Sequence, residues 1–310
     1  MPSAFTLRSP NVSADASLQT LRRDPLLTGV ANSGVRFIAD TCFPWSYPGG
    51  AQAGRAAAAA PADQAVIYDV SENANGKIVK VGGQTISYAG GGFDFSALTE
   101  RGSYLEAPAS VAADIWATYG GASQRFMVCG YFKLPSLANW NTSGNAAPLL
   151  SFATLNAGVG NPDMITIAQT NGGGLMSFRQ TGGATLAYTS VTPPAYDALA
   201  QVAFWRNASG VGLTVKVGAT RVTTLDAVGT ANTENFSGQT GRFGVGTAYW
   251  QPSLTGQTNA RNFRVFRPFV ENLARSGRDP LTVLDADWAR VQARIAASAA
   301  ANGGTSLIFV

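Results

Sequence analysis

The stretch 201–218, QVAFWRNASGVGLTVKVG, decides the fold class. From residue 211 to residue 217 every second residue is apolar, and the residues between them are glycine, threonine and lysine. A period of two is the pattern of a β-strand that has one face on a core and the other in water. Residues 201–206 form an equally β-rich run, and the sequence Asn207-Ala208-Ser209-Gly210 between the two runs is typical of a turn. We therefore expect an antiparallel hairpin here.

Two segments earlier in the chain carry a more specific pattern. Residues 90–95 read GGGFDF, and residues 103–108 read SYLEAP. Apolar runs of strand length follow them at roughly ten-residue spacing, as a β-sandwich requires. These runs are 124–134, 149–154, 164–170, 175–179 and 185–189.

This order of segments resembles the concanavalin A-like, laminin G-like jelly roll. In that family a GxxFDF segment precedes a YLEVP-like strand, and later strands read xVAFxxN, VxLxVNG and FxGxG. A strand of alternating apolar and polar residues and a short terminal helix follow. The matching residues here, in the same order, are 90–95, 103–108, 202–205, 213–218, 243–246, 263–266 and 281–295. One departure is that Val217-Gly218 stands where the family has an Asn-Gly turn. The resemblance covers residues 63–297 and implies an all-β, antiparallel β-sandwich jelly roll.

The resemblance divides the chain into three parts. Residues 1–61 are expected to form an extended N-terminal arm and linker, residues 62–297 the jelly-roll domain, and residues 298–310 a C-terminal tail. The short helix that closes the domain is predicted at about 280–296, with Asp279 as its N-cap and Pro280 as its first residue. An apolar stripe follows at helical spacing. That stripe consists of Leu284, Trp288, Val291 and Ile295.

Composition limits the chemistry that the chain can perform. Only 13% of the 310 residues are charged, the net charge is +4, and there is no histidine. Without histidine, a Ser-His-Asp triad and every His-containing metal site are excluded. The small, diffuse positive charge does not favour nucleic acid as a partner. The sequence therefore predicts no cofactor and no metal centre, and leaves open a weak calcium site at Asp163 or Asp226.

Acidic residues do not form a typical glycosidase pair. Some relatives of this fold cleave polysaccharides with an ExDxxE-type cluster on one strand, because the nucleophile and the proton donor must project from one face. The nearest pairs here are Asp285 with Asp287, at a predicted helix start, and Glu100 with Glu106, on a segment that leads into a strand. We expect neither pair to be catalytic, so the chain is predicted not to be an enzyme.

The two cysteines, Cys42 and Cys129, lie far apart in the sequence and fit no metal motif. Cys129 stands in an apolar run, where a buried free thiol is the usual state, and a disulfide between the two is the alternative. The N-terminal residues lack the basic start and apolar core of a signal peptide, and no apolar run is long enough to cross a bilayer. We therefore expect a chain that is made in a cytoplasm and that has no membrane partner.

Apolar side chains in both terminal extensions are candidate assembly contacts. Aromatic side chains are costly to leave in water, so those of the arm pack either on this chain's own sandwich or on a neighbouring subunit. An apolar tail with strand propensity can add to a sheet edge, its own or a neighbour's. The residues are Phe43, Trp45 and Tyr47 in the arm and Leu307, Ile308 and Phe309 in the tail.

Three loop aromatics are candidate sugar-stacking residues. Trp140, Tyr249 and Trp250 stand in segments rich in Asn, Ser, Thr and Gln. An amphipathic ring beside amide and hydroxyl groups is typical of a carbohydrate or protein contact. Burial of each ring in the core is the alternative.

Together these features predict a non-enzymatic structural protein of a tailed-bacteriophage virion. The step comes from the resemblance, because laminin G-like proteins decorate phage heads or form parts of tails, baseplates and fibres. The partners would be other virion proteins and copies of the chain itself, joined through the two extensions, and its location would be the virion. The alternative is a carbohydrate-binding module or adhesin that recognises a bacterial surface glycan through the three loop aromatics. A glycosidase with an unfamiliar acid pair is a third hypothesis.

Overall fold

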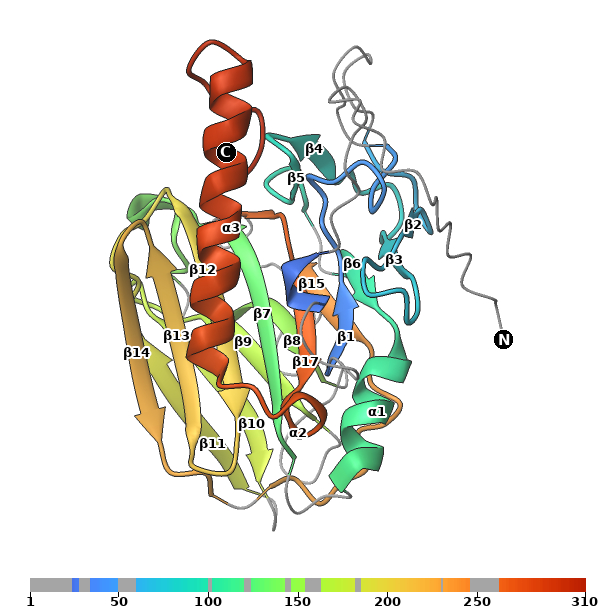
Figure 1. Cartoon of the computed structure of the whole chain (residues 1–310), viewed down its shortest axis with the longest axis vertical. Coiled ribbons are helices and arrows are strands. Elements are labelled where there is room, and N and C mark those ends of the chain that lie inside the picture. The colour runs from blue at the N-terminus through green and yellow to red at the C-terminus, as the bar shows by residue number, and fades with distance from the viewer. Residues whose placement is uncertain are drawn as a thin grey trace, which may run out of the picture.

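Two antiparallel β-sheets face each other across an apolar core in the computed structural model of the chain (Figure 1). The described strand pairs are all antiparallel. The predicted fold class, an all-β antiparallel β-sandwich with a C-terminal helix, is therefore confirmed. The structure describes residues 24–27, 34–49, 60–99, 102–119, 124–142, 146–153, 163–181, 185–229, 231–245 and 262–310.

The eight-stranded sheet has the strand order β11-β10-β9-β8-β15-β6-β3-β2. Its inward side chains are apolar: Ile78, Leu105 and Phe243 lie side by side on three neighbouring strands and are fully buried. The strands are β2 (Val66–Ile67), β3 (Gly76–Val79), β6 (Ser103–Ala107), β8 (Ala147–Phe152), β9 (Ile165–Gln169), β10 (Leu175–Thr181), β11 (Thr185–Val191) and β15 (Gly241–Val245).

The nine-stranded sheet has the strand order β14-β13-β12-β7-β16-β5-β4, and β17 joins β1 to the same β7. The hairpin predicted from 201–218 is present as β12 and β13, in which Val202 pairs with Val215 and Phe204 with Leu213. The strands are β1 (Val35–Ile38), β4 (Ser87–Ala89), β5 (Gly92–Asp94), β7 (Phe126–Lys133), β12 (Leu199–Arg206), β13 (Val211–Val217), β14 (Thr220–Asp226), β16 (Arg264–Val265) and β17 (Phe269–Asn272).

Three α-helices and two short 3-10 helices complete the described fold. They are α1 (Ala109–Tyr119), α2 (Leu273–Ser276), α3 (Pro280–Ala301), η1 (Pro25–Leu27) and η2 (Leu137–Asn139). The sequence did not predict α1, which is fastened to the sheet by Asp114: its carboxylate accepts hydrogen bonds from Arg36 on β1 at 2.7 Å and from Asn272 at 2.7 Å. The predicted helix α3 starts as expected, with Asp279 accepting from the Thr282 amide at 2.8 Å, but it continues past residue 296 to Ala301.

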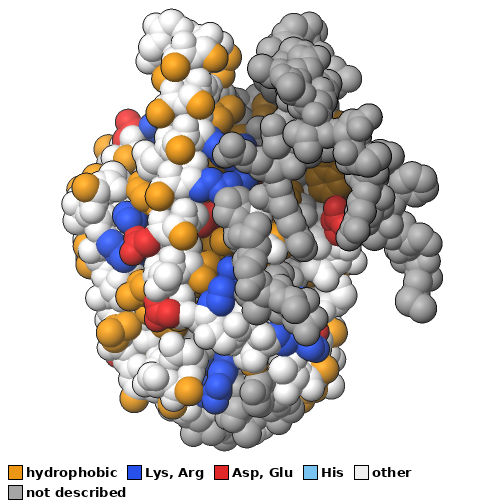
Figure 2. Space-filling view, viewed as in Figure 1, with side chains coloured by type: hydrophobic (Ala, Val, Ile, Leu, Met, Phe, Trp, Pro, Cys, Tyr) orange, Lys and Arg blue, Asp and Glu red, His pale blue; other side chains and the backbone are white. Residues whose placement is uncertain are grey.

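Helix α3 covers the outer face of the nine-stranded sheet, which corrects one expectation. The polar positions of β13 were expected in water, yet Thr214 is fully buried and Lys216 is mostly covered. The reason is that the stripe on α3 lies against this face: Trp288 stacks on Tyr131 of β7 with ring centroids 5.9 Å apart and planes 10° from parallel. Figure 2 shows α3 running along this face with basic and acidic side chains beside it.

A buried ionic cluster fastens α3 and the N-terminal segment to the sheet. At its centre the Arg267 side chain is fully buried and contacts three carboxylates: Asp24 at 2.9 Å, Asp40 at 2.8 Å and Asp287 at 3.1 Å. From α3, Arg290 contacts Asp24 and Arg294 contacts Asp40. Three cations therefore meet three anions, so no charge of the cluster is left unpaired. We call these six residues the arginine cluster: Asp24, Asp40, Arg267, Asp287, Arg290 and Arg294.

The arginine cluster shifts the pKa values of Asp40 and Arg267. Burial alone would raise the pKa of Asp40, but the charges of Arg294 and Arg267 outweigh burial and hold that pKa below its ordinary value of 3.8. Burial would lower the pKa of Arg267, but Asp287, Asp24 and Asp40 outweigh it and raise that pKa well above its ordinary value. The opposite charges around Asp40 and Arg267 therefore keep these two side chains ionised.

Part of the predicted N-terminal arm belongs to the sandwich. Residues 34–49 contribute β1 to the nine-stranded sheet, and Tyr47 lies in the core with its ring centroid 4.9 Å from that of Phe93. The side chain of Asp40 joins the arginine cluster. Among the described residues, the boundary expected at residue 61 therefore does not separate an arm from the domain.

The tail folds back on this chain's own β4–β5 hairpin. The Val310 amide donates to the Gly90 carbonyl at 3.3 Å, and Phe309 is buried with its ring 5.4 Å from that of Phe266. Gly91 has a φ of +86°, and a Cβ there would lie 2.7 Å from the sulfur of Cys42 and 3.1 Å from Ile308. The glycine run 90–92 is thus a hairpin turn that leaves room for the tail.

No helix among the described residues is both long and apolar enough to span a membrane.

The arginine cluster predicts a pH-dependent loss of stability. Asp40→Asn should lower the free energy of unfolding at pH 7 by about 3–5 kcal/mol, because it leaves Arg267 and Arg294 buried with less negative charge. The folded pKa of Asp40 is depressed, so its contribution is complete above the unfolded pKa and is lost as the pH falls through the folded pKa. Urea unfolding at several pH values should therefore show the two proteins converging in stability below about pH 4.

Asp285→Asn is the matched control for this measurement. Asp285 also contacts two cations, Lys216 at 2.6 Å and Arg221 at 2.9 Å, but 54% of its side chain is exposed. Its removal should change stability by less than about 1 kcal/mol. Equal effects of the two substitutions would contradict the central role of the buried cluster.

Removal of residues 1–61 should abolish cooperative folding rather than release a folded monomer. The truncated chain would lack β1, Asp24 and Asp40, which leaves Arg267 with Asp287 as its carboxylate partner in the cluster. Each lost partner costs about 3–5 kcal/mol, against a total stability of about 5–15 kcal/mol for a native protein. Circular dichroism during heating would test this, and a sharp thermal transition of the truncated chain would refute it.

Candidate functional site

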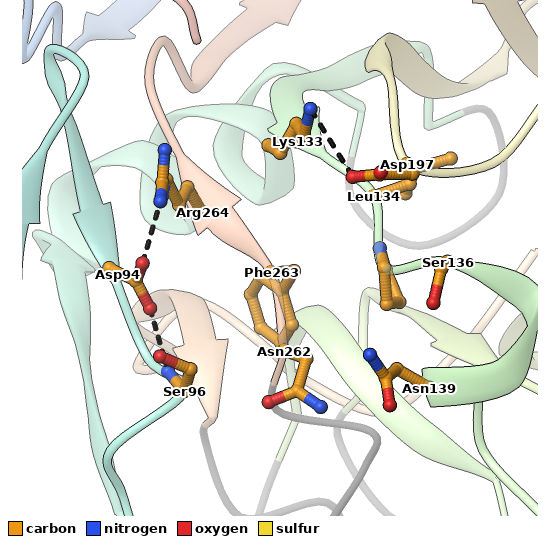
Figure 3. A pocket seen from close by; sticks show the side chains of 11 residues that line it. Asp94, Ser96, Lys133, Leu134, Ser136, Asn139, Asp197, Asn262, Phe263 and Arg264 are labelled. Carbon is orange, nitrogen blue, oxygen red and sulfur yellow. Dashed lines mark hydrogen bonds and ion pairs between the residues drawn. The ribbon is translucent and has the colours of Figure 1, made fainter.

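A polar pocket of about 320 Å³ opens at one end of the nine-stranded sheet. Strand register builds one wall, because Arg264 on β16 pairs with Asp94 on β5 on one side and with Lys133 on β7 on the other. Residues paired directly across neighbouring strands project from the same face, so three charged side chains border the pocket (Figure 3). The loops after β7 and before β12 and β16 complete the lining.

The charged side chains of the pocket form two ion pairs. Arg264 Nε lies 2.8 Å from Asp94 Oδ2, and Lys133 Nζ lies 3.3 Å from Asp197 Oδ1. Burial alone would raise the pKa of Asp94, but hydrogen bonds from Ser96 and Arg264 outweigh burial and hold that pKa below its ordinary value of 3.8. Asp94 is therefore ionised at neutral pH, and the two ion pairs leave these four side chains with no net charge.

Three further polar side chains line the pocket and make no side-chain hydrogen bond with any other described residue. They are Ser136, Asn139 and Asn262. In Figure 3, Ser136 and Asn139 lie on one side and Asp94 on the other, with the ring of Phe263 between them. Phe263 is nearly fully buried and stacks on Phe95 with ring centroids 5.4 Å apart, so it is a rigid apolar part of the wall. The fold leaves these amide and hydroxyl groups available to a ligand.

Trp140, predicted from the sequence as a sugar-stacking residue, lies in the core instead. It is 1% exposed, its indole N–H donates to the Thr170 carbonyl at 3.0 Å, and its ring meets that of Tyr196 edge to face at 5.2 Å. A ring with both faces packed offers no surface to a sugar. The same loop nevertheless reaches the pocket, because η2 turns the preceding residue, Asn139, outward.

Tyr249 and Trp250, the other two predicted stacking residues, lie outside the described residues, so their prediction stays untested. The candidate assembly contacts divide into exposed and buried residues. Phe43, Trp45 and Leu307 are exposed by 40%, 47% and 59%, Ile308 is half-buried, and Tyr47 and Phe309 are buried within this chain.

The acidic residues considered from the sequence are held by cations where the structure describes them. Asp287 belongs to the arginine cluster, Asp285 contacts Lys216 and Arg221, and Glu106 lies 3.6 Å from Lys77. Glu100 lies outside the described residues.

The structure also describes both residues considered for calcium. Asp226 accepts a hydrogen bond from Thr189, and Asp163 is buried. The described part of the chain contains no group of three or more Cys, Asp or Glu side chains arranged to hold a metal ion. Cys42 and Cys129 are both free thiols, so they do not form the alternative disulfide. Burial raises the pKa of both thiols.

No protein-family model matches the chain, and no curated protein matches it. Solved structures show a distant likeness. The receptor-binding domain of botulinum neurotoxin C/D mosaic serotype is 10% identical, with a TM-score of 0.43 over 77% of this chain and 48% of that one. The Ruminococcus gnavus IT-sialidase CBM40, bound to alpha2,3 sialyllactose, is 18% identical, with a TM-score of 0.37 over 58% of this chain and 89% of that one.

A Trypanosoma rangeli sialidase, in complex with 2,3-difluorosialic acid, is 13% identical, with a TM-score of 0.37 over 74% of this chain and 35% of that one. The chain thus spans about half the length of the neurotoxin domain and about a third of the sialidase. Similarity at this level does not indicate a ligand for this chain.

Proposed function

We propose that the chain is a non-enzymatic carbohydrate-binding module whose ligand is held by the polar pocket. One observation carries the proposal: Ser136, Asn139 and Asn262 line one hollow, and their side chains make no hydrogen bond with the described part of the chain. Polar side chains that hold a fold together are bonded to it, whereas those of a binding site are completed by the ligand.

A sugar matches the mixture of groups in the pocket. Sugar hydroxyls both donate and accept hydrogen bonds, so they can bond to carboxylates, to cations and to the amide groups of Asn139 and Asn262. Phe263 and Leu134 line the pocket but are almost fully buried, so the polar groups supply the contacts with a sugar. The volume of about 320 Å³ lies at the small end of ligand pockets, which suits one or two sugar units. Because the ion pairs cancel, a simple anion gains no attraction from a net charge.

The pocket favours binding over glycosidic bond cleavage. A general acid needs a raised pKa so that it carries a proton at neutral pH, whereas the pKa of Asp94 is lowered. The second carboxylate, Asp197, is 71% exposed and lies 3.3 Å from Lys133 Nζ. Both carboxylates therefore suit acceptance of sugar hydroxyl protons in hydrogen bonds.

A structural role in a tailed-phage virion is a second proposal. Exposed Phe43 and Trp45 would serve such a role as contacts with another subunit. Carbohydrate binding is the first proposal because several polar side chains without a hydrogen-bond partner among the described residues line one pocket. A binding protein can also be built into a larger particle.

The proposed function predicts a loss of sugar binding without a loss of fold. On a glycan array the intact chain should bind at least one glycan, and the double variant Asn139→Ala with Asn262→Ala should bind it about tenfold more weakly, since each lost hydrogen bond is worth about 0.5–1.5 kcal/mol. The melting temperature should stay close to that of the unaltered chain, because neither amide bonds to a described residue.

Asn171→Ala is the matched control, since Asn171 is also an exposed loop asparagine but does not line the pocket. It should leave the array signal unchanged. Absence of binding to every glycan, or equal binding by the double variant, would contradict the proposed function.

A further inference from the structure

Three aromatic side chains form a row at the surface, away from the core and from the polar pocket. The ring centroids of Phe43 and Trp45 are 6.4 Å apart, and those of Trp45 and Tyr68 are 5.8 Å apart. The three residues are exposed by 40%, 47% and 39%. Exposed aromatic rings in mutual contact cost hydrophobic free energy unless another molecule covers them. We call Phe43, Trp45 and Tyr68 the aromatic row.

The backbone beneath the aromatic row is held rigidly. Buried Ser46 donates through its hydroxyl to the Tyr68 carbonyl at 2.7 Å, and its carbonyl accepts from the Tyr68 amide at 2.8 Å. The Asp40 amide donates to the same hydroxyl at 3.0 Å, and the Phe43 carbonyl accepts from the amides of Ser46 and Tyr47. These bonds fix both segments that present the rings. Little ordering is then needed when a ligand binds, so the row is preorganised.

A hollow of about 340 Å³, which we call the polar hollow, lies on the outer face of the eight-stranded sheet, and Val66 in its lining stands two residues before Tyr68 of the aromatic row. Exposure alternates from Val66 to Tyr68, so both side chains point outward. Val66 pairs with Lys77, and Lys77 pairs with Glu106, so these three side chains share that face. The hollow also contains Gln64 and Asn75.

The amide groups of the hollow supply hydrogen-bonding capacity beside the rings. The side-chain oxygen of Asn75 accepts from the Asp69 amide at 3.1 Å, which leaves its NH₂ group without a partner among the described residues. Lys77 Nζ lies 3.6 Å from the Glu106 carboxylate, a loose contact that leaves both groups able to bond to hydroxyls.

We propose that the aromatic row and the polar hollow form a second carbohydrate site, which takes consecutive units of a polysaccharide. Sugar rings have apolar C–H faces that cover aromatic rings and hydroxyls that bond to the neighbouring amide and charged groups. A protein partner large enough to cover the row would also cover Lys77 and Glu106, and burial of charge at the centre of an interface is unfavourable. The inference takes its class of ligand from the proposed function, but it uses none of the pocket residues.

The test is electrophoresis of the folded chain in gels that contain a soluble β-1,4-glucan, a β-1,3-glucan, a mannan, an arabinoxylan or solubilised peptidoglycan. At least one polysaccharide should retard the unaltered chain. Trp45→Ala should weaken that retardation about tenfold, because it removes the central ring of the row. Trp45→Phe, which keeps an aromatic ring, should restore most of it. Tyr188→Ala is the control, since Tyr188 is another exposed aromatic residue, at 51%, on the edge strand β11.

The outcomes separate the second site from the pocket. Unchanged retardation of Trp45→Ala, with the pocket variants still losing their array signal, would overturn the second site alone. If no gel retards the unaltered chain although it binds a glycan on the array, the second site alone would likewise be overturned. No carbohydrate signal in either assay would overturn both proposals. Light scattering gives a further check: an oligomer that Trp45→Ala converts to a monomer would show that the row is a protein interface and overturn the inference.

Discussion

Burial of the Arg267 guanidinium is the constraint on which the rest of the structure depends. A charge with no exposed surface is stable only when partners surround it, and its partners come from the N-terminal segment (Asp24, Asp40) and from α3 (Asp287). The cluster therefore requires both ends of the chain to be in place at once. It also explains why α3, which starts next to β13, stays fixed along the outer face of the nine-stranded sheet and excludes water from β13.

Periodicity in the sequence predicted the strands whose apolar residues alternate. It missed two elements, β17 and α1, whose apolar pattern is interrupted or weak. The hairpin 201–218 and the stripe of α3 follow from periodicity alone. Strand β17 contains Glu271, fully buried and paired with Arg278 at 2.6 Å, so a charged residue interrupts its apolar pattern. Helix α1 was missed because its alanine-rich run follows directly on a strand, although Val111 and Ile115 do recur at helical spacing in the core.

The candidate pocket was predicted only in part, and the reason is geometric. The composition of the loop around Trp140 predicted a binding residue there. Composition does not determine which side chains of a short 3-10 turn face the solvent. The Trp140 indole N–H donates to the buried Thr170 carbonyl, so the ring lies in the core. The preceding residue, Asn139, therefore faces the surface. The partners Asp94, Lys133 and Arg264 are up to 170 residues apart in sequence. The pairing register of β5, β16 and β7 brings these three side chains together. The hydrophobic periodicity of a single sequence does not determine which strands pair or in which register.

The β4–β5 hairpin connects the two proposed carbohydrate sites. Phe93 on β5 packs against Tyr47, whose neighbour Ser46 holds the aromatic row, while the next residue, Asp94, lines the polar pocket. The tail rests on the same hairpin, because the Val310 amide donates to the Gly90 carbonyl at 3.3 Å, and the Val310 carbonyl accepts from the pocket residue Arg264 on β16 at 2.5 Å. The two sites are thus connected through one strand, since Asp94 lines the pocket and Phe93 packs on the segment that carries Phe43 and Trp45. Because the two sites are rigidly attached, a polysaccharide bound at one site has a high effective concentration at the other, which raises its overall affinity. A ligand too short to span both sites has no such increase in affinity.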